Sequence, residues 1–222
     1  MRVLLACEES QAVCKEFREL GYEAYSCDLL PTSGDNPEWH IQGDLLKVMY
    51  SGEWDLMIAF PPCTHLAVSG AKHFKKKQKD GRQQEGIDFF MKVANAPIEF
   101  IAIENPVGIM STLHRKPDQI IHPFYFGDSF SKKTCLWLKN LQPLKHYKEG
   151  DQLNIGDPFA KVTHVHPGEY VTFPSGKRMP KWYNDASGKN AGHLRSKTFP
   201  GFAKAIAQQF TYQIESLVKE AI

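Results

Sequence analysis

The hydrophobic pattern of the first part of the chain alternates between short apolar runs and amphipathic segments. Residues 3–6 are apolar without interruption, which predicts a buried strand. Apolar positions then recur at helical spacing over residues 13–20, and Gly21 predicts the end of that helix. Residues 22–26 predict a second strand, which closes on Asp28.

The same alternation continues downstream. Residues 54–60 and 100–103 carry apolar runs typical of strands, and residues 87–93 between them have the pattern of a helix. Short apolar strands separated by helices are typical of a parallel sheet that helices cover on both faces. The pattern therefore predicts an α/β fold with a doubly wound, Rossmann-like sheet.

The pattern changes after about residue 120. Residues 132–141, KKTCLWLKNL, predict one further strand. Residues 141–198 combine frequent Gly and Pro with scattered aromatic residues and no sustained period, which predicts a small appendage of short strands and loops. Residues 202–218 return to helical spacing and predict an amphipathic C-terminal helix.

Composition and charge narrow the class of protein but not its partner. The chain has 222 residues, enough for one domain of ordinary size with a small insert. Apolar residues make up 42% and charged residues 23%, which excludes disordered, collagen-like and disulfide-scaffold classes. The formal net charge is only +2, so a nucleic-acid partner would have to show itself as a local basic patch.

The five cysteines are widely spaced and form no CxxC pair. Neither a disulfide framework nor a Cys-rich zinc site is predicted, and a reducing compartment is the natural setting. No apolar run is long enough for a transmembrane helix, and the N-terminal run is too short for a signal peptide. These observations predict a cytoplasmic protein.

The residues that follow each predicted strand are the first candidates for a site, because doubly wound sheets bind ligands beyond the carboxyl ends of their strands. Residues 7–10, Cys-Glu-Glu-Ser, lack a GxGxxG pattern and carry two carboxylates, which would repel a pyrophosphate at a helix N-terminus. Asp28, after the second strand, is placed to bond ribose hydroxyls. The pattern favours a cofactor without phosphates over a dinucleotide.

Two further strand ends carry reactive side chains. Cys63 follows two prolines, so a stiff turn presents it at the same edge of the sheet; taken alone, it would more simply be a small buried apolar residue. Glu104 ends the neighbouring strand and precedes Asn-Pro, so a nucleophile and an acid can face one substrate. A helix cap or a surface carboxylate is the alternative for Glu104.

Four segments, in order, resemble the C5-cytosine methyltransferases that use S-adenosylmethionine. FPPCTHLA around Cys63 resembles their Pro-Pro-Cys motif, and IENPVGI at 103–109 resembles their Glu-Asn-Val/Pro motif. GDLL at 43–46 is similar to their segment before the nucleophile strand, and RSKTFPGFAKAIAQQF at 195–210 to their last motif and helix. The phrases IENPVGIMST, KKTCLWLKNL and SKTFPG resemble a group of short members common in phages and prophages.

This resemblance implies a DNA (cytosine-5-)-methyltransferase. Cys63 would add to C6 of cytosine as a thiolate, and Glu104 would bond N3 and the exocyclic amine. Lys132 or Lys133 would stand where the family has an arginine, without its bidentate geometry. A cytosine in duplex DNA would have to be flipped out of the helix to be reached.

For the cofactor, S-adenosyl-L-methionine, the resemblance implies contacts from the strand ends and the last motif. Asp28 would take the ribose, Asp44 the adenine amine, and Pro61 the adenine face. The expected cofactor-binding residues are Ala6, Cys7, Glu8, Ser10, Asp28, Leu29, Asp44, Leu45, Phe60, Pro61, Ser196 and Lys197. The family's glycine-rich loop is missing at residues 5–10, so side chains are expected to shape the methionine end of the pocket.

Basic residues gather in the segment after Cys63, namely Lys72, Lys75, Lys76, Lys77, Lys79 and Arg82. Such a run is often only a solvated face. Its place, where the family has a mobile loop that closes over nucleic acid, predicts phosphate binding. The resemblance also divides the chain into a catalytic and cofactor-binding domain, 1–140 with 196–222, and a small target-recognition region, 141–195.

Other functions stay open on the sequence. The same chemistry could act on RNA or a free cytosine nucleotide, because the recognition region is short. An inactive nucleic-acid-binding protein could retain the fold, because the first motif is altered. A cysteine hydrolase built on Cys63 and His65 lacks an evident orienting Asn or Asp, and His164 and His166 lack further ligands at zinc spacing, so no metal is predicted.

Overall fold

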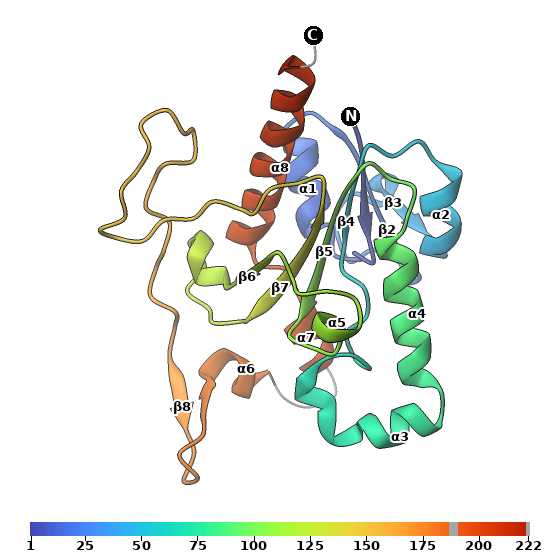
Figure 1. Ribbon diagram of the computed structural model, residues 1–222, viewed down its shortest axis with the longest axis vertical. Helices are drawn as coiled ribbons and strands as arrows, with labels where there is room; N and C mark the ends of the chain where they lie inside the picture. The colour runs from blue at the N-terminus through green and yellow to red at the C-terminus, as the bar shows by residue number, and fades with distance from the viewer. Residues whose placement is uncertain (187–190, 221–222) are drawn as a thin grey trace.

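The computed structural model describes residues 1–186 and 191–220 (Figure 1). The strands are β1 (Arg2–Ala6), β2 (Glu23–Asp28), β3 (His40–Gln42), β4 (Leu56–Ala59), β5 (Phe100–Pro106), β6 (Gln119–Ile121), β7 (Thr134–Lys139), β8 (Tyr170–Thr172) and β9 (Arg178–Pro180). The helices are α1 (Ala12–Glu19), α2 (Leu45–Ser51), α3 (Phe74–Lys79), α4 (Arg82–Ala94), α5 (Met110–Leu113), α6 (Lys181–Asp185), α7 (Ala191–Ser196) and α8 (Pro200–Glu220).

Among these residues the large sheet has the strand order β3-β2-β1-β4-β5-β7-β6. From the central β1 the chain runs outward through β2 to β3 and then returns to β4 on the other side, all in parallel. The reversal between β1 and β4 is where doubly wound sheets bind ligands. The predicted fold, a doubly wound, Rossmann-like sheet with a small β appendage, is confirmed.

One edge of the sheet departs from the parallel pattern. β5 continues parallel to β4, but β7 inserts antiparallel between β5 and β6. The link from β6 to β7 contains only a short 3₁₀ segment, Pro123–Phe126. Parallel strands are usually joined through an α-helix, which this link lacks, and β7 runs back antiparallel to its neighbours.

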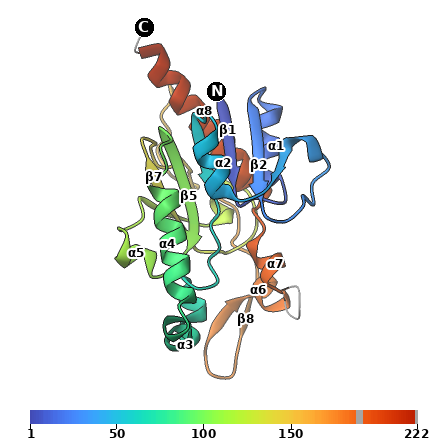
Figure 2. The same cartoon turned by 90° about the vertical axis from the view of Figure 1, so that its right-hand side faces the viewer.

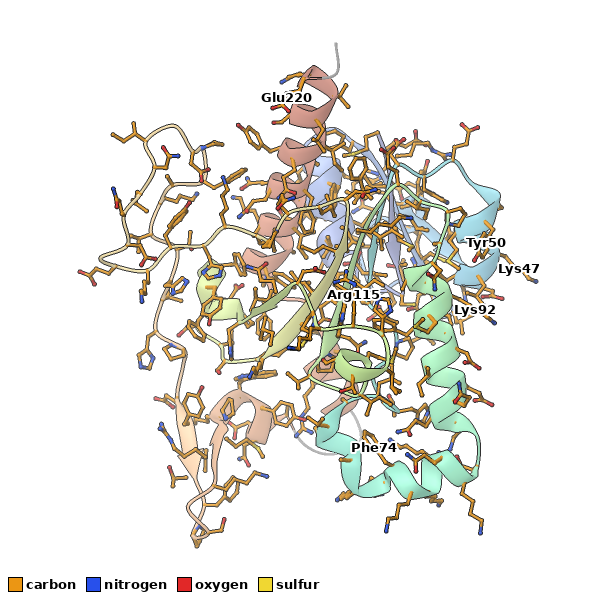
Figure 3. All side chains as sticks on the ribbon, in the orientation of Figure 1. Lys47, Tyr50, Phe74, Lys92, Arg115 and Glu220 are labelled. Carbon is orange, nitrogen blue, oxygen red and sulfur yellow. The ribbon has the colours of Figure 1, made fainter. Side chains whose placement is uncertain are left out.

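The central strands are buried on both faces, which explains their uninterrupted apolar runs. Val3 and Leu5 face a core shared with α1 and α8, whereas Leu4 and Ala6 face a second core shared with α2 and α4. Lys47 marks the exposed outer side of α2 (Figure 3). Within the described residues, no helix combines the length and the apolar character that crossing a membrane requires.

After β7 the chain leaves the sheet, and it packs against the sheet again with α8. The first part of the intervening residues 141–198 is tied to α8 by Gln209, whose side chain bonds both the N–H and the carbonyl of Lys145 at 2.7 and 2.8 Å. Their second part forms the β8–β9 hairpin, which projects from the same end of the molecule as α3 (Figures 1 and 2). Helices α6 and α7 were not predicted, because five and six residues are too few to show a period.

Candidate active site

A cleft of about 990 Å³ opens at the carboxyl edge of the sheet. One wall is made by the residues that follow three parallel strands: 7–10 after β1, 60–64 after β4, and 104–107 at the end of β5. The other wall comes from residues 131–133, the β8–β9 hairpin with α6, and the segment that leads into α8. The strand ends singled out from the sequence at Cys7, Cys63 and Glu104 therefore share one cavity.

The exit from β4 is a tight turn that presents Cys63 to the cleft. The carbonyl of Cys63 accepts the N–H groups of Leu66 and Ala67, both at 2.9 Å. The thiol is half-buried and lines the cleft. Two prolines before it fix the backbone entry, since each locks one φ angle.

The exit from β5 is bonded directly to that turn. Asn105 is 1% exposed, and its Nδ2 donates to the carbonyl of Pro61 at 2.7 Å. A buried amide that spans two adjacent strand exits fixes their separation. Cys63 and Glu104 lie close in sequence to Pro61 and Asn105, so this bond also fixes how they are placed relative to each other on the same wall of the cleft.

A second connection joins the two exits further along. The N–H of Val68 donates to Val107 and that of Ile109 donates to Leu66, each at 3.0 Å. Between them, a Cβ on Gly108 would lie 2.5 Å from the carbonyl oxygen of Leu66. Only glycine permits this close approach, which explains the residue that follows Asn-Pro-Val.

The charges around Cys63 oppose one another. Burial raises the pKa of the Cys63 thiol, and the Glu104 carboxylate raises it further, whereas Lys132 and Lys77 lower it. Lys132 Nζ lies 4.0 Å from Glu104 Oε1, and both side chains are largely buried. Lys132 therefore faces the candidate acid, while the more exposed Lys133 lies at the cleft wall.

The exit from β1 holds a buried carboxylate in place of a glycine loop. Glu8 is 4% exposed and accepts the N–H groups of Val13 and Cys14 at 2.6 and 3.1 Å. These are unpaired donors of the first turn of α1, so Glu8 caps its own helix. Burial raises the pKa of Glu8 to about 7, although the two hydrogen bonds favour the charged form and lower the pKa. A helix start already occupied by a carboxylate has no free N–H at these positions for a phosphate.

The expected cofactor residues divide into two groups. Cys7, Glu8, Ser10, Phe60, Pro61, Ser196 and Lys197 line the cleft. Ala6, Asp28, Leu29, Asp44 and Leu45 lie outside that lining, at the end of β1, at the end of β2 and at the start of α2. Asp44 caps α2 by accepting the N–H of Leu46 at 2.9 Å. The side chains of Ala6 and Leu45 are buried in a core, so only their backbone could reach a ligand.

The basic segment after Cys63 is helical and differs from the expected mobile loop. A 3₁₀ segment, Val68–His73, leads into α3 and then α4. The four lysines 72, 75, 76 and 79 are exposed, but Lys77 is 8% exposed and donates to the carbonyl of Thr64. Arg82 pairs with Asp80 at 2.5 Å. Two of the six predicted phosphate-binding side chains are thus engaged within the protein.

The cleft also contains side chains that the sequence did not single out. Tyr170 and Arg178 project from the hairpin, with the guanidinium 4.9 Å from the ring centre. The guanidinium carbon of Arg195 likewise lies 3.8 Å from the ring centre of Tyr183. Proline, serine and glycine at residues 174–176, which follow the β-type segment 170–173, were a usable turn signal. No sequence pattern indicated that these arginines would stack on tyrosines.

His164 and His166 of the appendage have structural partners. His164 stacks on Tyr125, with ring centres 4.5 Å apart, and its Nε2 lies 2.8 Å from Nδ1 of His146. His166 accepts the N–H of Gly168, and the side chain of His193 lies outside the described residues. Elsewhere in the described chain, no group of three or more His, Cys, Asp or Glu side chains is placed to hold a metal ion.

Comparisons with known proteins give a limited result. No family model matches the chain, and no curated protein matches it. Solved structures do match, among them that of a candidate DNA modification methyltransferase encoded within a prophage of E. coli. The sequences are 15% identical and the TM-score is 0.47 over 69% of this chain. The match spans 52% of that protein's length.

Proposed function

We propose that this protein transfers a methyl group from S-adenosylmethionine to C5 of cytosine in DNA, through a covalent adduct on Cys63. The observation that carries the proposal is the pairing of Cys63 with Glu104 at adjacent strand exits, fixed by the Asn105–Pro61 hydrogen bond. A nucleophile and an acid in one cleft are what addition to a pyrimidine ring requires.

The reaction follows from the chemistry of cytosine. The Cys63 thiol loses its proton, and the thiolate adds to C6, which places electron density on C5. Glu104 bonds N3 and the exocyclic amine and so stabilises the adduct. C5 would take the methyl group from the sulfonium as its C–S bond breaks, which leaves the neutral thioether S-adenosylhomocysteine. A base would then remove the C5 proton, and the thiolate would leave to restore the ring. Burial and Glu104 oppose the thiolate, whereas the positive charges of Lys132 and Lys77 favour it.

The cleft fits the proposed cofactor better than it fits a dinucleotide. S-adenosylmethionine supplies a methyl group on a positively charged sulfur and contains no phosphate. Glu8 already fills N–H positions at the start of α1, where a pyrophosphate would bind. Phe60 and Pro61 lie between the β1 exit and Cys63, so they would hold the adenine face, with Ser196 and Lys197 on the opposite wall.

The flanks of the cleft favour a nucleic acid over a free nucleotide. Lys75 and Lys76 of α3 are exposed on one side, and Lys177 and Arg178 belong to the hairpin on the other. Figure 2 shows α3 and the hairpin projecting at the same end of the molecule. We assign residues 141–195 to target recognition on this basis, with phosphates bound by the flanks and a flipped cytosine between them.

Transfer of tritiated methyl groups from S-adenosylmethionine to duplex DNA, RNA and dCMP tests the proposal. We expect incorporation into duplex DNA at cytosine. Incorporation only into RNA or dCMP would show that DNA is not the substrate, while the proposed methylation of cytosine would stand. Cofactor binding without transfer to any of the three would overturn the proposal and indicate a binding protein that retains the fold.

A further inference from the structure

Lys77 is the one lysine of α3 that points into the protein. The helix begins at Phe74, at the lower end of the molecule in Figure 3. Its lysines 75, 76 and 79 are exposed, whereas Lys77 is 8% exposed. A lysine is seldom buried unless it is paired, because removing an ammonium from water is costly.

The Lys77 ammonium has a backbone partner and no acidic one. Its Nζ donates to the carbonyl of Thr64, the residue directly after Cys63. Among the described residues, no carboxylate lies within ion-pair distance of this Nζ. An unneutralised buried cation adds little to stability, since a carbonyl offsets only part of its lost hydration. The fold alone gives no reason for a charge at this position.

A neutral side chain performs the same backbone contact one residue later. Gln83 of α4 is 4% exposed, and its Nε2 donates to the carbonyl of His65 at 3.2 Å. The turn after Cys63 is thus fixed from outside at two successive carbonyls. An amide is sufficient at the second carbonyl, so a hydrogen bond by itself does not require a charged donor at the first.

We propose that Lys77 is a positioning residue for Cys63, which holds the nucleophile turn through Thr64 and adds a second positive charge to that of Lys132. This inference rests on the proposed role of Cys63. The charged groups that act on the Cys63 thiol come from three elements: Glu104 of β5, Lys132 before β7, and Lys77 of α3. Lys132 is also engaged by Glu104, so Lys77 is the cation without a competing carboxylate.

The test measures the Cys63 thiol itself and needs neither cofactor nor DNA. The rate of Cys63 alkylation by iodoacetamide is followed against pH by mass spectrometry of its peptide, which separates it from the other four cysteines. Lys77→Met keeps an unbranched buried chain and removes the charge. We expect its alkylation rate at pH 7.5 to fall about threefold or more, with the midpoint of the pH profile moved upward.

Three variants make the result specific. Lys76→Met removes an exposed charge from the same helix and should leave the profile close to the native one. Lys77→Arg should restore it, because the charge returns. Gln83→Leu loosens the turn without changing charge and should leave the midpoint in place. Should Lys77→Met fail to fold, Lys77→Gln provides the neutral variant.

A Lys77→Met profile that coincides with the native one would overturn the proposal, as would equal shifts in Lys77→Met and Gln83→Leu. These outcomes are independent of methyl transfer. A shifted thiol profile in a protein that transfers no methyl group would retain the role of Lys77 and reject the proposed function.

Discussion

The exits of β1 and β4 lie side by side at the same edge of the sheet, but the partners that hydrogen-bond to their backbone groups come from different places. After β1, Glu8 satisfies the start of α1 from within its own segment. After β4, Asn105, Lys77 and Gln83 satisfy the turn from other elements. At the first exit, the Glu8 carboxylate occupies the free N–H groups. At the second, the bonding side chains come from other elements, and the Cys63 thiol lines the cleft.

The two exits differ in the reactivity of their cysteines. Both exits carry a cysteine that lines the cleft, but burial and Asp28 raise the pKa of Cys7 to about 12. The cations that oppose this effect at Cys63 do not act on Cys7. A thiol becomes a nucleophile through its surroundings more than through its exposure.

Replacing the two cysteines gives the largest expected contrast. Cys63→Ser should lower methyl transfer by at least about 10³-fold, because the hydroxyl does not form the adduct. Cys7→Ser should lower it less than about tenfold, through the KM for the cofactor. Initial rates of tritium transfer to duplex DNA measure both. Equal losses in the two variants would remove the distinction between the exits.

Glu104→Gln separates the acid from the nucleophile. Transfer should fall about 10²-fold, because in the proposed adduct Glu104 would bond the base. Alkylation of Cys63 should instead become faster at neutral pH, since the carboxylate that raises the pKa of the thiol is gone. Iodoacetamide labelling of the same preparation measures the second effect. Slower alkylation would contradict the arrangement of charges.

Glu8 should make stability depend on pH. Its folded pKa of about 7 lies above the ordinary 4.5, so the fold favours the protonated form. The free energy of unfolding should be highest below pH 4.5 for this group, decrease by about 3 kcal/mol up to pH 7, and then level off. Urea titrations of the native protein and of Glu8→Gln check this. The variant curve should lack that slope, and parallel curves would show that Glu8 does not titrate.

Gly108 tests the second connection between the β4 and β5 exits and has the smallest expected effect. Gly108→Ala places a methyl group against the carbonyl of Leu66 and should lower the free energy of unfolding by about 2 kcal/mol. Gly43→Ala meets nothing within 4 Å and should change it by less than about 0.5 kcal/mol. Chemical denaturation compares the two. Similar losses would mean that the close approach is not needed.

Much of the fold could be predicted because its strands are buried on both faces and read as apolar runs. The antiparallel β7 could not, since an apolar run such as Thr134–Lys139 does not encode direction. Cys63 and Glu104 could be placed in one cleft from their positions at strand ends. The inward side of Lys77 could not be predicted, because it lies in a run of lysines and only the packing of α3 separates it from them.

The proposed function depends on a covalent bond between Cys63 and cytosine. A duplex that contains 5-fluorocytosine tests it directly, because fluorine at C5 prevents the elimination that releases the thiolate. Incubation with S-adenosylmethionine should give a one-to-one adduct that survives denaturation, maps to the Cys63 peptide and is absent in Cys63→Ala. Methyl transfer without such an adduct, or an adduct that persists in Cys63→Ala, would contradict the account.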